Sequence, residues 1–348
     1  MAQITAEQWK ALLVQDPDAS ILQTAEWGDL KADFGWTPAF IANDTVGGMV
    51  LFRRLPRWAL GFTIAYIPRG PVTFDREKAD YAGFWREVHA LCRTKRAIFL
   101  RVEPDEWQDT PEAKQLTAGM IPAGMISPGI NGFRPGFSTV QPPSTILVSL
   151  EGSEADWLAR MNQKTRYNIR LSQKKDLTVS ESDDLAIFAS LMQETGTRDQ
   201  FGIHSRAYYQ KCFDNFKPGG QVRLLVVAYQ GKPLSAMMLF IRGKRASYLY
   251  GASSNEERNR MPNHLLQWSA MKLAAENGCS EYDLWGIPDE DEATLEAQFQ
   301  EQQDDLWPVY RFKRGFGGAV RRTLGTYDYP YLLPLYRLMA WAARRRKG

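Results

Sequence analysis

Hydrophobic and polar positions switch between strand-like and helix-like periods in one order, most clearly between Tyr248 and Gly318. A tyrosine-rich strand ends in the small-residue turn 251–254, a helix begins at Met261-Pro262 and ends at Asn277-Gly278, and a strand follows over 282–287. Proline suits the first helical turn because its missing N–H would have no partner there, and glycine commonly follows a helix end. Such short turns between strand, helix and strand predict a parallel crossover within one sheet.

The first half of the chain repeats this order. Residues 39–55 predict a hairpin, 62–72 a strand, 81–96 a helix and 97–104 a buried strand, while 224–254 supplies the antiparallel strands of the second half. The repetition is one of pattern and not of residue identity. It predicts a duplicated α/β unit.

Two further helices carry candidate binding residues. Thr24 caps a predicted helix that runs to about Phe34, on which Trp27 and Lys31 are four residues apart and share a face. Trp27 in the core with Lys31 as a solvated flank is the plainer interpretation. The segment WLARMNQKTRYNIRLSQKK predicts one helix with six basic residues from Arg160 to Lys175. Basic helices with an embedded tyrosine suit phosphate backbones, but a solvated face has the same pattern.

Composition narrows the class of protein. The 348 residues fit two domains, and 44% hydrophobic with 24% charged residues is typical of a globular protein. The polar N-terminus lacks the apolar core of a signal peptide, and no run of about 18 apolar residues exists. Three scattered cysteines and three isolated histidines show no ligand spacing. We therefore expect a cytoplasmic protein with reduced thiols, no metal and no cofactor.

Charge is concentrated at the C-terminal end. Residues 311–348 contain ten lysines and arginines against one acid, Asp328, so 1–310 carry a net charge of −6 within the overall +3. A basic segment on a slightly acidic protein indicates a polyanionic partner such as phosphates, tRNA or an anionic membrane face. For the run Arg344 to Lys347, a solvated tail is equally plausible.

Several motifs, taken in order, resemble the Fem-type peptidoglycan bridge enzymes, the FemABX family of aminoacyl-tRNA-dependent aminoacyltransferases. They are ILQTAEWGDLK, FTIAYIPRGP, WLARMNQKTRYNIR, YLYGASSNEERNRMPNHLLQW, YDLWGIP and YRFKRGFGG. The resemblance covers about Ile21 to Tyr336. It implies an α/β (α+β) fold of two tandem GNAT-like domains, with mixed central sheets flanked by helices. Domain 1 would span 1–145, completed by 319–348, and domain 2 would span 146–318. The lack of a sustained heptad run indicates that the coiled-coil arm of some members is missing.

The resemblance also implies roles for individual residues. Lys31 would contact phosphates of the peptidoglycan precursor, and the catalytic pair Phe312-Lys313 would sit where acceptor and aminoacyl-tRNA meet. Other substrate-binding residues would be Thr197 and Arg198, the channel-lining Tyr248 or Tyr250, and Glu103. Glu103 stands where known members have Asp, which weakens a catalytic role for it.

Aminoacyl-tRNA is an activated ester, so its transfer to an amine needs neither a covalent nucleophile nor a metal. Lys313 is our candidate for the cation that stabilises the tetrahedral oxyanion or for a contact with the terminal phosphates of the tRNA, packed on one side and facing an open cleft on the other. No histidine or carboxylate pair stands out as a general base, so the substrate itself can take the released proton. Glu103 and Asp283 are the fallback general bases, and either can be structural instead. We expect a monomer that acts on a nucleotide- or lipid-linked precursor, with peripheral contact to the inner membrane face.

Two rival functions remain. One is an acyl-CoA-dependent GNAT-type N-acyltransferase, because residues 314–319 match the pyrophosphate-binding pattern R-x-x-G-x-A. That loop needs a helix directly after it, whereas VRRTLGTYDY predicts a strand. The other is a non-catalytic module that binds tRNA or a membrane surface through the basic amphipathic segment LLPLYRLMAWAARRRK. We expect this segment to pack on the first domain.

Overall fold

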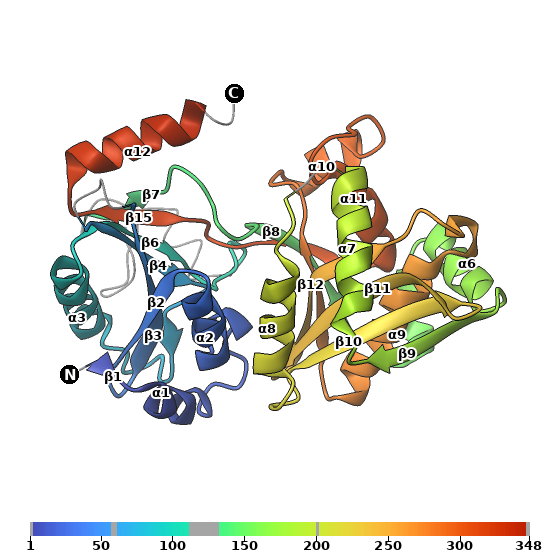
Figure 1. Cartoon of the computed structure of the whole chain (residues 1–348), viewed down its shortest axis with the longest axis horizontal. Helices are drawn as coiled ribbons and strands as arrows, with labels where there is room; N and C mark the ends of the chain where they lie inside the picture. Colours follow the sequence, from blue (N-terminus) through green and yellow to red (C-terminus); the bar gives the residue numbers. More distant parts are fainter. Residues whose placement is uncertain (1–2, 57–60, 111–131, 200–201, 346–348) are drawn as a thin grey trace. The chain divides into compact units, whose positions relative to one another are not determined.

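The computed structural model describes residues 3–56, 61–110, 132–199 and 202–345. The chain forms two compact units (Figure 1). Unit 1 comprises Met1–Pro143 and Arg321–Gly348, and unit 2 comprises Ser144–Val320. Arg346 and Lys347 of the basic tail lie outside the described residues.

Unit 1 is built on a mixed sheet with helices on both faces. Its strands are β1 (Gln3–Ile4), β2 (Trp36–Ala42), β3 (Val46–Arg54), β4 (Thr63–Pro68), β5 (Val72–Thr73), β6 (Ala97–Glu103), β7 (Arg134–Pro135) and β15 (Tyr327–Pro330). Its helices are α1 (Ala6–Leu13), η1 (Ile21–Gln23), α2 (Ala25–Asp33), α3 (Tyr81–Thr94) and α12 (Leu333–Arg345). The strand order is β1-β2-β3-β4-β6-β15-β7, with β5 paired to β3.

Strand β3 shows why this sheet needs two helical layers. Its first seven residues are all buried, as expected of a strand that is covered on both faces. Val50 packs in a cluster with Phe84 of α3. On the opposite face, Gly28 of α2 comes so close to Met49 that an added Cβ would lie 2.9 Å from its sulfur.

Unit 2 contains the second mixed sheet, in the order β14-β8-β13-β12-β11-β10-β9. The strands are β8 (Ser144–Ser149), β9 (Leu177–Ser182), β10 (Val222–Tyr229), β11 (Lys232–Arg242), β12 (Arg245–Ser253), β13 (Glu281–Gly286) and β14 (Ala319–Arg322), the last of which runs across the unit boundary. The helices are α5 (Glu154–Arg160), α6 (Gln163–Ser172), α7 (Leu185–Asp199), α8 (Arg206–Phe216), η3 (Arg258–Arg260), α9 (Pro262–Glu276), α10 (Glu292–Gln298), α11 (Trp307–Lys313) and η4 (Arg314–Phe316).

Each unit contains the predicted crossover. In unit 1, β4 leads through α3 to β6, which pairs with β4 in parallel. In unit 2, β12 leads through α9 to β13, again in parallel. The other strand pairs identified among the described residues are antiparallel. The prediction of two mixed sheets flanked by helices is confirmed. Among the described residues the longest helices, α7 and α9, have 15 residues each.

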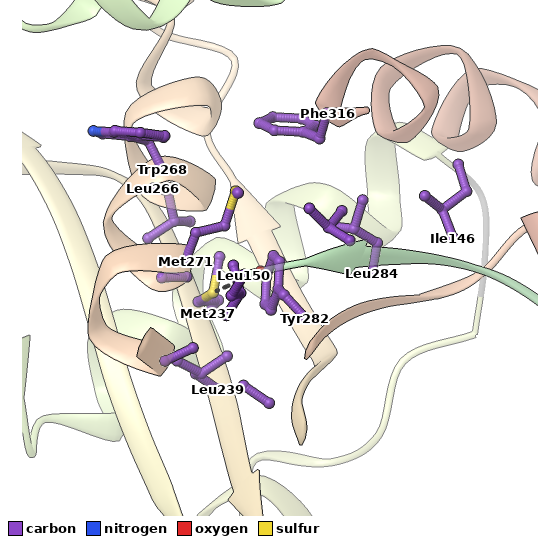
Figure 2. Packing of buried hydrophobic residues seen from close by; sticks show 14 of the residues in the cluster. Ile146, Leu150, Met237, Leu239, Leu266, Trp268, Met271, Tyr282, Leu284 and Phe316 are labelled. Atoms are coloured by element: carbon purple, nitrogen blue, oxygen red, sulfur yellow. Dashed lines mark hydrogen bonds between the residues drawn. The ribbon is translucent and has the colours of Figure 1, made fainter. Parts of the chain in front are cut away.

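The core of unit 2 lies between the sheet and helices α5, α6 and α9. Figure 2 shows Met237 and Leu239 of β11 close to Leu266 and Met271 of α9, with Phe316 beside this cluster. On the other face, Phe216 of α8 packs edge-to-face on Phe240 at 5.5 Å between ring centroids. This second layer consists of α7 and α8 (Figure 1).

The prediction of one continuous basic helix was wrong. The chain leaves the helix at Met161, whose backbone is extended, and starts α6 with Asn162 as its N-cap. The Asn162 side chain accepts a hydrogen bond from Thr165 N at 2.7 Å, and Asn162 N donates to Gly315 O at 3.0 Å. The Asn162 cap and its backbone bond to Gly315 together stabilise the break at residues 161–162 more than continued helix would.

Candidate functional site

Lys313 is the last residue of α11 and is buried in unit 2, with 5% of its surface exposed. Its Nζ donates hydrogen bonds to Gly286 O at 2.8 Å and to Trp285 O at 3.2 Å. The Nζ atom also lies 5.7 Å from the centre of the Tyr248 ring. The expectation that Lys313 faces an open cleft is therefore wrong for this structure: the amine is enclosed, and backbone carbonyls are its closest partners.

A bulge in β13 aims these carbonyls at the amine. Asp283 pairs with Leu147 and Gly286 with Thr145, so β13 has one residue more than β8 between these two pairs. Trp285 takes the left-handed conformation with φ of +62°. The Asp283 carboxylate holds this shape, since Oδ1 accepts hydrogen bonds from Trp285 N at 2.8 Å and from the Thr145 hydroxyl at 2.5 Å.

Burial lowers the pKa of Lys313 to about 7, and the negative charge of Asp283 opposes this effect only in part. A neutral amine has two hydrogens, which match the two carbonyls, and one lone pair that stays available as a proton acceptor. Lys313 can therefore exchange a proton near neutral pH. Asp283 holds the bulge, and its charge acts on the Lys313 amine; these contacts favour a positioning role over that of a general base.

Tyr248 and Tyr250 point to opposite faces of the sheet. Leu239 pairs with Tyr248 but its neighbour Met238 pairs with Tyr250, so a bulge at Leu249 interrupts the alternation. Tyr248 joins the cluster on the Lys313 side, and burial raises its pKa to about 12. Tyr250 instead lies on the α7–α8 side, where its hydroxyl is 3.2 Å from that of Tyr208. Of the two candidates, only Tyr248 adjoins Lys313.

Phe312 and Phe316 enclose His264, a residue that sequence analysis treated as isolated. The His264 ring lies 5.2 Å from that of Phe312 and 6.1 Å from that of Phe316, and its Nε2 is 3.2 Å from the amide nitrogen of Asn168. Burial, aided by the charge of Lys164, lowers the His264 pKa to about 4, so the ring is neutral at pH 7. In the sequence, the one indication that His264 lies near this site is its position in the first turn of α9, the helix that begins with Pro262.

Arg198 is anchored to the end of β12, the strand that carries Tyr248. Its Nη1 donates to Ser253 O at 2.9 Å and to Asn255 Oδ1 at 3.3 Å, and its Nε contacts Asp199. The Thr197 hydroxyl donates to Gln193 O of its own helix. Arg198 therefore lies beside the loop after β12, while the Thr197 hydroxyl bonds within its own helix.

In unit 1, Lys31 lies over the ring of Trp27, with 4.7 Å between Nζ and the ring centroid. The predicted helix is α2, capped by the Thr24 side chain, and Trp27 is 3% exposed. Trp27 is thus a core residue that also supports the lysine. Lys31 itself is half-buried, with its ammonium over that ring.

Glu103, also in unit 1, is fully engaged by the protein. Its carboxylate accepts hydrogen bonds from the Tyr66 hydroxyl at 2.5 Å, Val140 N at 2.6 Å, Gln141 N at 3.1 Å and the Thr326 hydroxyl at 2.9 Å. Four donors saturate a buried carboxylate. This geometry ties β6 to the segments around it, and it favours a structural role over contact with substrate.

The glycines after Lys313 serve close packing. A Cβ on Gly315 would lie 2.1 Å from Thr165 Oγ1, and one on Gly317 would lie 2.3 Å from Arg160 O. Arg314 forms an ion pair with Glu296. The strand β14 follows, as expected, so the residues that match R-x-x-G-x-A precede no helix N-terminus.

The described residues contain no cluster of three or more His, Cys, Asp or Glu side chains placed to hold a metal ion. In the same residues, no helix has the length and apolar character needed to cross a membrane.

Comparison with solved structures defines the class of protein. The crystal structure of FemX superimposes with a TM-score of 0.79 at 23% identity, covering 98% of this chain and all of the other. A tandem GNAT protein from the clavulanic acid biosynthesis pathway gives a TM-score of 0.51 at 11% identity. The fold is therefore the tandem GNAT-like fold.

The chain belongs to the FemAB family, whose model matches residues 4–230 and 228–344. Lipid II:glycine glycyltransferases of Staphylococcus saprophyticus and Staphylococcus haemolyticus are both 26% identical, over 97% of this chain and 94% of theirs. The first alignment runs over 409 positions against 348 residues here, so that relative contains insertions. The expected family and enzyme class, a Fem-type aminoacyltransferase, are confirmed.

Proposed function

We propose that this protein transfers an amino acid from aminoacyl-tRNA to the stem-peptide amine of a lipid-linked peptidoglycan precursor, at the cytoplasmic side of the membrane and as a monomer. The observation that best supports this proposal is the enclosed Lys313 amine, whose pKa is lowered by burial. The amine lies on the same side of the sheet as Tyr248 of β12 and bonds to the end of β13. The names of the glycyltransferase relatives support a lipid II-type acceptor.

The chemistry follows from the state of Lys313. As the acceptor amine attacks the ester carbonyl, neutral Lys313 takes the proton that the attacking nitrogen releases, and the C–O bond to the tRNA ribose then breaks. The resulting ammonium lies beside the tetrahedral oxyanion and is able to return its proton to the leaving ribose hydroxyl. One residue thus supplies both the proton acceptor and the stabilising cation.

Two other residues position the reactants. Asp283 keeps the bulge that orients Lys313. Phe312, which precedes Lys313 in α11 and is half-buried against Phe316 at 5.2 Å between ring centroids, supplies an aromatic wall at this end of the helix. Closing the site around the reactants would exclude water, which strengthens every charge interaction there.

The solvent face of α6 supports an RNA donor. Lys164, Tyr167 and Arg170 are all exposed at spacings of three residues, and Tyr167 is 62% exposed. Lys174, also exposed, follows just after the helix ends. Cations along one helix face suit a phosphate backbone, and an exposed ring suits base stacking. The helix adjoins the Lys313 segment, because Asn162 N donates to Gly315 O.

For the acceptor, we assign the precursor phosphates to Lys31 and a supporting role at the loop after β12 to Arg198. Both cations are partly buried and held in place, Lys31 over Trp27 and Arg198 by Ser253 O. Thr197 and Tyr250 remain weaker assignments, because their hydroxyls contact Gln193 and Tyr208 within unit 2.

The test is transfer by the purified protein with charged tRNA and a lipid-linked precursor, followed by mass spectrometry of the product. Supplying each aminoacyl-tRNA in turn identifies the amino acid, and muropeptides from cells with and without the protein report the same residue. We expect ribonuclease to abolish transfer and acetyl-CoA to have no effect. Transfer that survives ribonuclease would refute the tRNA donor, and RNA binding without any product would indicate the non-catalytic module.

A further inference from the structure

Helix α12 has one face that packs on unit 1. Tyr336 is buried in a cluster with Ile98 and Phe99 of β6, and its hydroxyl donates to Asp328 Oδ2 at 3.1 Å. Leu333, Leu335 and Met339 pack against the same cluster. The prediction that the C-terminal segment packs on the first domain is correct for this face.

The opposite face combines large apolar and cationic side chains. Leu338 is 59% exposed and Trp341 is 53% exposed, one turn apart. The exposed positions of the helix follow one stripe, namely Pro334, Arg337, Leu338, Trp341, Arg344 and Arg345. No acid occurs between 333 and 345, and the Arg345 guanidinium lies 4.2 Å from the centre of the Trp341 ring.

This combination is unusual within the molecule. In the part of the chain that the structure describes, seven large hydrophobic residues are exposed, and Leu338 and Trp341 are the two that share a helix. Scattered exposed apolar residues need no explanation, but adjacent ones in a basic stripe do. Tryptophan and leucine flanked by arginines suit the headgroup region of a bilayer, where the apolar parts enter the acyl boundary and the cations meet lipid phosphates.

We propose that the stripe defined by Arg337, Leu338, Trp341, Arg344 and Arg345 is a docking surface for an anionic phospholipid bilayer. The charge of the helix and its basic tail selects this occupant, because residues 333–347 contain five lysines and arginines and no acid. Only the biological role of this docking, which is to bring the enzyme to a lipid-linked acceptor, rests on the proposed function. Vesicle binding is measured without that acceptor, so the two ideas fail separately.

The test is cosedimentation of the full chain with vesicles of phosphatidylglycerol and phosphatidylcholine, compared with phosphatidylcholine alone. We expect binding to the anionic vesicles that weakens as salt is added. The double variant R344Q/R345Q should bind about 25-fold more weakly, about fivefold for each arginine. The double variant L338S/W341S should lose at least about tenfold while keeping its melting temperature, since both side chains are exposed.

A matched control is I203S/R206Q, which removes another exposed apolar residue and an exposed arginine three positions later, in unit 2. It should bind vesicles like the wild type. Equal binding by wild type and both α12 variants would overturn the proposal, as would equal binding to neutral vesicles. Loss of RNA binding by R344Q/R345Q with vesicle binding intact would also overturn it and assign the stripe to RNA.

A final comparison separates docking from catalysis. With precursor embedded in anionic vesicles, L338S/W341S should transfer more slowly than wild type, whereas with a precursor analogue that lacks the lipid the two should be equal. Equal rates on embedded precursor would refute a role in docking. An absence of transfer by wild type on either acceptor would refute the proposed function and leave vesicle binding to be judged alone.

Discussion

Replacing Lys313 with Met tests the buried amine by both stability and rate. Its pKa of about 7 lies well below the 10.5 of an ordinary lysine. This difference corresponds to about 5 kcal/mol that burial costs the charged form. The native state therefore binds fewer protons than the unfolded chain between about pH 7 and pH 10.5. Stability contributed by this group is lowest below pH 7 and increases as pH rises through that window.

The lowered pKa of Lys313 sets how the unfolding free energies of wild type and K313M differ with pH. Between pH 7 and pH 9 the wild type should gain about 2 kcal/mol from Lys313, and K313M should gain none of it. The variant leaves two backbone carbonyls without their donor, at a cost of about 1–3 kcal/mol. At pH 7 the buried amine still costs the wild type about 4 kcal/mol, more than the unpaired carbonyls cost the variant, so K313M should be the more stable there; at pH 9 about 2 kcal/mol of that cost remains, and the two proteins should be similar in stability.

Urea denaturation at a series of pH values measures this difference. The control is K10M, since Lys10 is half-exposed and Glu26 raises its pKa, so neither state titrates at Lys10 between pH 7 and pH 9. Transfer by K313M should fall by about a hundredfold or more. If the unfolding free energies of wild type and K313M change with pH in parallel, the amine is charged and solvated in the native state. If K313M transfers at the wild-type rate, the catalytic residue is not Lys313.

Three other substitutions probe the remaining features. K31M should raise the acceptor KM with little change in kcat or melting temperature, because a phosphate contact remote from the reacting amine is mostly uniform binding; unchanged kinetics with a lower melting temperature would make Lys31 a packing residue. G251A should lower kcat, because the added Cβ would lie 1.9 Å from the Tyr248 hydroxyl and must displace that ring; a kcat equal to wild type would separate Tyr248 from the reaction. D328N should cost about 3–5 kcal/mol in urea denaturation, because it breaks the buried two-bond pair with Arg101, in which both contacts are 2.8 Å; a loss below about 1 kcal/mol would contradict that role.

Sequence alone determined the features that depend on neighbouring residues. Pro262 at the start of α9 and Gly278 after its end bounded the helix, and the apolar runs around it gave the parallel crossover. The cap at Thr24 followed from the same local rules. Ordered motifs along the whole chain then indicated the family, which the family model confirms.

The tertiary structure decided what depends on register and burial. Alternation along a strand predicts that Tyr248 and Tyr250 share a face, yet the bulge at Leu249 puts them on opposite faces. A β-bulge is an extra residue in one strand relative to the strand it pairs with. The sequence near Leu249 does not specify that pairing, so the bulge could not be predicted from it.

The environment of Lys313 was beyond local reasoning for the same reason. Its partners Trp285 and Gly286 come from a bulge 27 residues or more away, shaped by Asp283. A lysine next to glycines reads as exposed, because lysine is rarely buried. Only packing of α11 against the end of β13 encloses the amine, and burial is what lowers its pKa.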